Sequence, residues 1–172
     1  KMRVEFKRRQ WEIQRALRKP LTTKDFILLK IIGKGAFGQV RLVKKKDTGE
    51  VLAMNTMVKS AMVLKNQVHH VNAQPNPLAK AGDPNPWMAE LHFSFQDEHN
   101  LYLIMEFLPG GDLMALLMKE DVVTEEATRF VAAETALAIQ SVLSLGDIHR
   151  DLKPDKLLLD SRRHFHLSDL GL

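Results

Sequence analysis

The stretch that decides the fold is HRDLKPDKLLL, from His149 to Leu159. The tripeptide DLG begins at Asp169, 18 residues after Asp151, and the segment 165–167 just before it has the composition of a strand. A DLG tripeptide alone is common in turns. Because it follows so specific a segment at this spacing, coincidence is a poor explanation, and we interpret both segments as parts of one site.

A second segment, GKGAFGQV from Gly33 to Val40, has the pattern G-x-G-x-x-G-x-V. In a dinucleotide-binding fold, such glycines open a helix. Here apolar and polar residues alternate after the glycines, so the pattern predicts the tip of a β-hairpin. Glycine lets the backbone approach a ligand closely, as in flaps that cover nucleotide phosphates. A plain hairpin turn is the alternative interpretation.

Alternation and turn residues predict five strands, and one long helix follows them. The helix should begin after the N-cap Thr124, stop near Gly146, and be fully buried because apolar residues lie on most of its sides. Prolines crowd residues 75–86 and exclude a regular helix there. The predicted strands are 26–32, one around Val40 and Leu42, 51–58, 91–95 and 101–107.

With three motifs in order, the chain resembles the NDR/LATS branch of the AGC Ser/Thr protein kinases. The most specific stretch is LYLIMEFLPGGD, from Leu101 to Asp112, which is similar to the hinge of that branch. The signature H-R-D-L-x-x-x-N fits at every position but its last. The resemblance implies an α+β kinase fold: a basic arm at 1–24, a β-sheet small lobe with hinge at 25–107, and the start of a helical large lobe at 108–172.

The resemblance also implies ATP and Mg²⁺ as cofactors and a protein as substrate. ATP would lie under Gly33, Gly35 and Gly38, and Asp169 would hold Mg²⁺. Asp151 would orient the substrate hydroxyl, and Lys153 would face the transferred phosphate. The other expected nucleotide contacts are Val40, Ala53, the backbone of Glu106 and Leu108, Asp112 at the ribose, and Leu158.

Three positions depart from the family pattern. Kinases carry a lysine on the third strand, paired with a helix glutamate, but this chain has Asn55 there, and Gln74 aligns best with the glutamate. Because both members of the ion pair are replaced, neither is left as an unpaired charge. Lys156 stands where the signature has asparagine, and an ammonium cannot ligate a cation. The chain also stops after DLG, before an activation segment, so we expect an impaired or inactive domain.

The charge is concentrated in residues 1–19, where eight Lys or Arg stand against two Glu. This arm therefore carries +6, whereas the whole chain carries +4. The simpler interpretation is a helix exposed to solvent, and the more specific one is an arm that binds a partner. By resemblance the partner would be an acidic Mob-type coactivator, and nucleic acid is a less favoured rival.

The 172 residues contain no cysteine and no apolar run long enough to cross a membrane. We therefore expect a location in the cytoplasm, with the nucleus as a second choice. Alternatives to an impaired kinase domain are a pseudokinase-like module acting through its basic arm, a piece of an active kinase, and a non-functional gene fragment. The full-length transcript would separate them.

Overall fold

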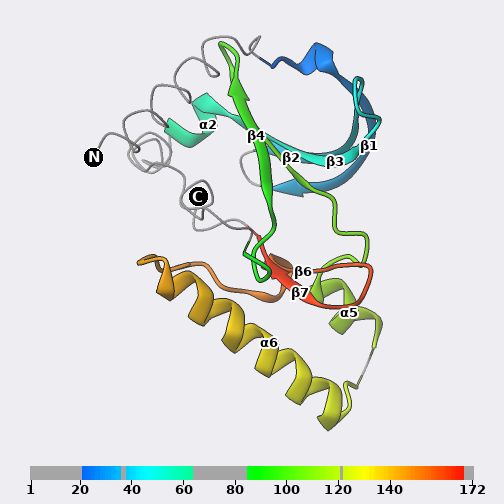
Figure 1. Ribbon diagram of the computed structural model, residues 1–172, viewed down its shortest axis with the longest axis vertical. Coiled ribbons are helices and arrows are strands. Elements are labelled where there is room, and N and C mark those ends of the chain that lie inside the picture. Colours follow the sequence, from blue (N-terminus) through cyan, green and yellow to red (C-terminus); the bar gives the residue numbers. More distant parts are fainter. Residues whose placement is uncertain (1–20, 36–37, 64–84, 121, 169–172) are drawn as a thin grey trace, which may run out of the picture.

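The computed structural model describes residues 21–35, 38–63, 85–120 and 122–168. Figure 1 shows a curved β-sheet at one end of the long axis and a helical part with a small hairpin at the other. The α+β fold class is confirmed, with a five-stranded sheet preceding the helical part in the sequence.

The sheet has the strand order β1-β2-β3-β5-β4, and every neighbouring pair is antiparallel. Gly35 pairs with Gly38, so the glycine pattern does lie at the tip of a hairpin. The first strand continues through the first two glycines, because β-pairing extends past the expected end at residue 32. The strands are β1 Phe26–Gly35, β2 Gly38–Lys45, β3 Val51–Val58, β4 Leu91–Gln96 and β5 Asn100–Glu106. A short helix, α2 Lys59–Val63, follows β3.

One face of the sheet carries a compact apolar core. Side chains alternate between the two faces of a strand, so Leu52 and Met54 lie in this core while Ala53 and Asn55 point to the opposite face. The ring of Phe95 stacks on Tyr102 at 4.9 Å between centroids, and the Phe26 ring stacks on Phe95 at 6.0 Å. The remaining core members are Val43 and Ile104.

The β4–β5 turn is organised around Asp97. Its carboxylate accepts hydrogen bonds from the Tyr102 hydroxyl at 2.7 Å and from the backbone N–H groups of His99 and Asn100 at 2.8 and 2.7 Å. These bonds, that of Tyr102 first, lower the pKa of Asp97 to about 2. The turn therefore keeps its charged acceptor at any pH above that value.

The helical part contains α5 Leu113–Lys119 and α6 Glu125–Ser144. Thr124 caps α6 as predicted, because its hydroxyl accepts from the N–H of Ala127 at 3.2 Å. Gly146 follows the helix with a φ of 80°, the conformation that favours glycine at such an end. A 3₁₀ turn, η2 Pro154–Lys156, leads into the hairpin of β6 Leu157–Leu159 and β7 Phe165–Leu167.

The expectation that α6 is fully buried is wrong. Within the described residues, α6 packs against β7 with one stripe, and its buried residues are Glu134, Ala138 and Val142. Phe130 and Leu137 are each 44% exposed and Leu143 is 54% exposed. A helix that contacts one neighbouring layer buries only the face toward that layer. Apolar residues on most sides of a helix therefore do not by themselves establish that the whole helix is buried.

Sequence reasoning missed Glu134, because residues 125–144 give no sign of the hydrogen-bond donors that lie beyond the helix. Its buried carboxylate accepts from His164 Nδ1 at 2.6 Å and from the N–H of Phe165 at 2.9 Å. The bond to Glu134 raises the pKa of His164. A buried carboxylate with two donors is satisfied, so this residue fastens α6 to the β6–β7 hairpin.

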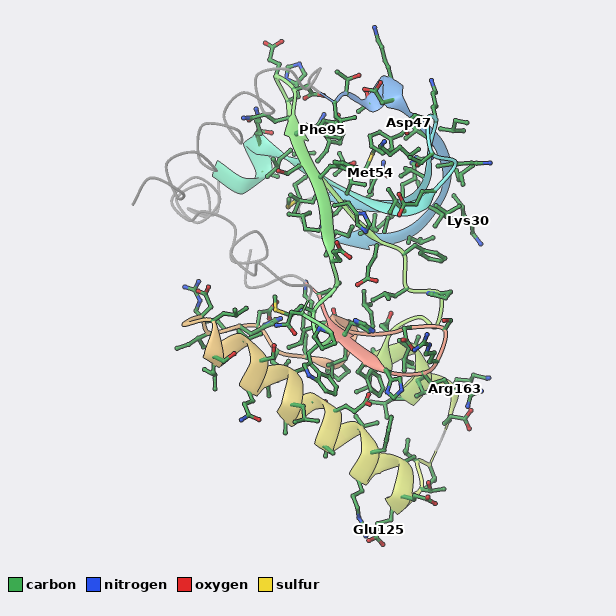
Figure 2. All side chains as sticks on the ribbon, in the orientation of Figure 1. Lys30, Asp47, Met54, Phe95, Glu125 and Arg163 are labelled. Atoms are coloured by element: carbon green, nitrogen blue, oxygen red, sulfur yellow. The ribbon has the colours of Figure 1, made fainter. Side chains whose placement is uncertain are left out.

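The β6–β7 turn holds Arg163 in a backbone conformation suited to glycine. Its φ is 69°, and Figure 2 shows its side chain pointing outward from the hairpin. Asp160 Oδ1 fixes the turn by accepting from the N–H groups of Arg162 and His164, both at 2.8 Å. Burial raises the pKa of Asp160, but the hydrogen bonds from the backbone outweigh burial and leave it below its usual value.

We predict that Arg163→Gly stabilises the chain. Left-handed backbone costs a residue with a Cβ about 1–2 kcal/mol, and glycine recovers part of this, so the free energy of unfolding should rise by about 1 kcal/mol. Urea unfolding measures it. Arg162→Gly is the matched control and should give no increase, since Arg162 is not in the left-handed region. An equal gain in both variants would show that the backbone of Arg163 is not the cause.

Several predicted features lie outside the described residues: the arm at 1–20, the proline-rich part of 64–84 with Gln74, and Asp169 in the DLG segment. No helix among the described ranges is both long and apolar enough to span a membrane.

Candidate functional site

A cavity of about 300 Å³ lies between the sheet and the β6–β7 hairpin. Its wall on the sheet side comes from β1, β2 and β3. Val40 pairs with Gly33 on one side and with Asn55 on the other, and cross-strand partners share a face. This register places the wall on the face opposite the sheet core. The wall residues are Ile32, Gly33, Val40, Ala53 and Asn55.

The connection after β5 forms the back of the cavity. The end of β5 is fixed because the N–H of Glu106 donates to the carbonyl of Glu90 at 2.9 Å, and the N–H of Glu90 donates to the Glu106 carboxylate at 2.8 Å. Strand pairing ends at Glu106, and Phe107, Leu108 and Pro109 then run along the cavity. Backbone groups beyond the strand can therefore face a ligand.

The chain next crosses close to β6 at two glycines. A Cβ on Gly110 would lie 2.5 Å from the Cβ of Leu159, and Gly111 has a φ of 77°. The N–H of Gly110 donates to the carbonyl of Leu159, and the N–H of Leu159 donates to the carbonyl of Gly111. Glycine at both places lets the connection lie on β6, which brings Leu158 to the floor of the cavity.

Asp112 also lies at the floor, where it caps α5. Its Oδ1 accepts from the N–H of Ala115 at 2.7 Å, and its backbone bridges to Leu158. Capping fixes the carboxylate at the cavity edge, where the sequence predicted a ribose contact.

The segment 149–156 contributes Asp155 and Lys156 to the cavity lining, and His149 anchors it. Its buried ring bonds through Nε2 to the carbonyl of Ser168 at 3.1 Å, which ties this segment to the end of β7. Asp151 is exposed, and its Oδ2 lies 3.4 Å from Lys153 Nζ, which is also 3.8 Å from Asp155 Oδ2. The structure brings Asp151 and Lys153 together beside the cavity, and their catalytic roles stay predictions.

Both altered positions within the described ranges line the cavity. Asn55 lies on the sheet wall, and Lys156 lies at the opposite side with Asp155 and Ser168. Of the predicted glycines, Gly33 lines the cavity, whereas Gly35 and Gly38 pair at the hairpin tip. Gln74 and Asp169 cannot be placed, because both lie outside the described residues.

Apolar walls around a few polar backbone groups fit a flat base such as adenine. Among residues 21–35, 38–63, 85–120 and 122–168, no group of three or more His, Asp or Glu could hold a cation, and the predicted ligand Asp169 lies outside these ranges. Lys156 occupies the position from which a second ligand should come, and it offers three donors and no acceptor.

Sequence reasoning missed several cavity residues. Ile32 directly precedes the glycine pattern, and Phe107 lies within the stretch 101–112, so their positions in the sequence could have indicated them. Ala89 could not have been found, because it lies at the cavity only through its backbone bond to Leu167 at 2.9 Å. The group also includes Pro109, Gly111, Asp155 and Ser168.

Comparison with known protein families gives one match: the protein kinase domain matches residues 26–172 of this chain. The chain belongs to the protein kinase family. It is 54% identical over 170 residues to the serine/threonine-protein kinase tricornered of Drosophila pseudoobscura pseudoobscura, covering 99% of this chain and 37% of that protein. It is 58% identical over 158 residues to sax-1 of Caenorhabditis elegans, covering 92% of this chain and 33% of that protein.

A fungal relative gives a similar result. The serine/threonine-protein kinase CBK1 of Candida albicans is 53% identical over 165 residues, covering 96% of this chain and 22% of that protein. All three relatives are kinases of the NDR/LATS branch, which confirms the family indicated by the sequence. The chain spans between 22% and 37% of the length of these relatives.

Proposed function

We propose that this chain is the nucleotide-binding part of an NDR/LATS-type Ser/Thr protein kinase in which phosphoryl transfer is strongly impaired. One observation carries the proposal: a single cavity combines the apolar walls and the connection after β5 with Asn55 and Lys156 at positions where kinases have other residues. The site can therefore still bind the adenine base although the side chains that contact the phosphates and the metal in kinases are replaced.

The base would be held by backbone and apolar contacts. Val40, Ala53 and Leu158 form surfaces above and below a flat ring, and the backbone of Glu106 and Leu108 supplies hydrogen bonds at its edge. These contacts do not involve the altered side chains. Asp112 would use the carboxylate oxygen that does not cap α5 to bind the ribose.

Bound ATP would supply the phosphoryl group, and this chain's residues would orient the acceptor. The exposed Asp151 carboxylate is accessible to a substrate hydroxyl and would take up or orient its proton. Lys153 lies within 4 Å of both Asp151 and Asp155, so its ammonium is held near the proposed path of the phosphate.

Transfer should fail because phosphoryl transfer depends on positioned charge more than on covalent chemistry. Asn55 has a neutral amide where a strand lysine should face the phosphates. Lys156 replaces an oxygen ligand with an ammonium. Losing one such preorganised group typically costs about 10²–10³ in rate, and two groups are altered here.

The test is transfer of γ-labelled phosphate from ATP to a generic basic peptide. Asp151→Ala is the control, because it removes the group that would orient the acceptor. Label on the peptide should equal that of the control, and label clearly above it would overturn the proposal.

A second proposal concerns residues 1–19, whose +6 charge favours an acidic protein partner of the Mob type. Binding should weaken as salt rises, because exposed charges are screened beyond about 10 Å at 0.1 M salt. Replacing Arg8, Arg9 and Arg15 together with alanine should weaken it by about tenfold or more. Titration of the chain and of the variant with an acidic protein, and separately with a nucleic acid, measures the affinity for each of the two candidate partners. Unchanged affinity of the variant for either ligand would exclude an electrostatic role of the arm for that ligand.

A further inference from the structure

The β6–β7 hairpin meets α6 through the ion pair of Glu134 and His164. We infer that this pair is a proton-dependent clasp, which fastens the hairpin to α6 more firmly in slightly acidic than in alkaline solution. The hairpin also supplies Leu158 to the floor of the cavity, so the clasp acts on the element that supports the candidate site.

Both oxygens of the Glu134 carboxylate bind the chain where β7 begins. Oε1 lies 2.6 Å from His164 Nδ1, and Oε2 accepts from the N–H of Phe165 at 2.9 Å. The Glu134 side chain is 8% exposed, whereas the His164 side chain is 54% exposed. The carboxylate is therefore enclosed between helix and hairpin, while the imidazole can exchange its proton with the solvent.

The clasp lies at the edge of the apolar core that α6 shares with the hairpin. Phe165 is buried in the same core as Ala138 and Val142 of α6. Because Glu134 binds both Phe165 and the residue before it, a weaker bond at this carboxylate should loosen the hairpin from the helix. The N–H of Phe165 is the group in which that loosening can be observed.

Protonation of His164 should change the strength of the clasp without removing it. A neutral imidazole with its proton on Nδ1 can still donate to the carboxylate. A charged imidazole forms a charge-assisted hydrogen bond, which is roughly twice as strong. The buried Glu134 carboxylate gains from a cation in particular, because little water reaches it to stabilise its charge.

The other charges near His164 do not reverse this effect. The hydrogen bond to Glu134, and then the negative charge of Glu134, raise the pKa of His164 above the ordinary value of 6.5, and they outweigh burial and Arg162, which lower it. Asp160 in the same turn raises it further. The ring of Phe130 on α6 carries no charge, and its centroid lies 6.1 Å from that of the imidazole.

The direction of this shift fixes the pH range of the effect. Below pH 6.5 the imidazole is charged in both the folded and the unfolded chain, so the added stability is fully present. It is lost as the pH rises through the raised pKa of His164, because the folded chain then releases a proton that it holds more tightly than the unfolded chain does. The hairpin should therefore be less firmly attached in alkaline solution.

The test is amide hydrogen exchange of the 172-residue chain, measured by NMR at about pH 6 and about pH 8.5. Each rate is divided by that of an unfolded chain at the same pH, which removes the direct effect of hydroxide. The resulting protection of the Phe165 N–H should fall by about threefold or more between the two conditions. The titration of the His164 imidazole, followed on the same sample, should have its midpoint above 6.5.

Three variants identify the group that responds to pH. His164→Gln keeps a donor but cannot titrate, so protection of the Phe165 N–H should no longer depend on pH. Glu134→Gln keeps an acceptor for that N–H and removes the charge, so the midpoint of the His164 titration should fall toward 6.5. His166→Gln is the matched control on the same hairpin and should leave the pH dependence of Phe165 protection unchanged.

Three outcomes would overturn the inference. The first is equal protection of the Phe165 N–H under the two conditions in the original chain. The second is a His164 midpoint at or below 6.5 in the original chain. The third is a His164→Gln variant with the same pH dependence as the original chain, because another group would then be responsible. The first two need no variant, so the inference can fail even where a substitution unfolds the chain.

Discussion

Replacing Gly38 with alanine is expected to lower the stability of the chain more than any other single change considered. A Cβ added at Gly38 would lie 1.7 Å from the carbonyl oxygen of Thr56 and 2.8 Å from its carbonyl carbon. Both atoms belong to the backbone of β3, so no side chain can move to relieve the clash. Strand β2 must shift away from β3 and lose pairing at the hairpin that covers the cavity.

The expected loss is about 3 kcal/mol in the free energy of unfolding, or roughly 6–12 °C in melting temperature for a chain of this size. Thermal unfolding followed by circular dichroism measures it. Gly35→Ala is the matched control at the same hairpin tip, because no atom of the residues that the structure describes is found within 4 Å of its added Cβ. Its stability should change by about 0.5 kcal/mol or less. Equal losses in the two variants would contradict the close approach of β2 to β3.

The second large effect concerns catalysis. We expect no measurable phosphate transfer from this chain, and we expect Asn55→Lys alone not to restore it. Position 55 lies on the cavity wall, so a lysine there would enter the site, but Lys156 would still occupy the position of a metal ligand. By resemblance to the family, the expected partner of the new lysine is Gln74, so the lysine would lack the carboxylate that orients it in kinases.

Transfer of labelled phosphate to a basic peptide measures this, with Asp151→Ala as background. Lys156→Asn is the matched single reversal, and it too should stay at background, because Asn55 would remain. Each unrepaired group is expected to cost about 10²–10³ in rate. Transfer by either single variant clearly above background would show that the other altered position matters less than we infer.

The local motifs predicted the site better than the overall pattern predicted burial. The glycine pattern with alternation after it identified a hairpin, and the register then brought Val40 and Asn55 to one cavity wall. These predictions succeeded because backbone sterics and the two-residue period of a strand act locally.

The predictions that failed or were missed depend on contacts between distant segments. The exposure of Phe130 follows from what packs beside α6, and the helix periodicity does not contain that information. The role of Glu134 depends on donors about 30 residues later, at the β6–β7 hairpin. Arg163 could not be recognised as strained, because the sequence does not state which turn residue takes a positive φ.

The resemblance to kinases was needed to assign chemistry to the cavity. Physical reasoning explains why Lys156 cannot be a metal ligand, but only the family pattern says that a ligand is expected there. The structure adds that Asn55 and Lys156 line the same cavity, so the two departures affect one site.

The most direct test of the central claim measures nucleotide binding and phosphate transfer on one sample. The 172-residue chain would be equilibrated with γ-labelled ATP and a basic peptide, and bound label and peptide label would both be counted. The account predicts bound ATP that unlabelled ADP displaces, with peptide label at the level of Asp151→Ala. Peptide label above that level, or no displaceable ATP at all, would contradict it.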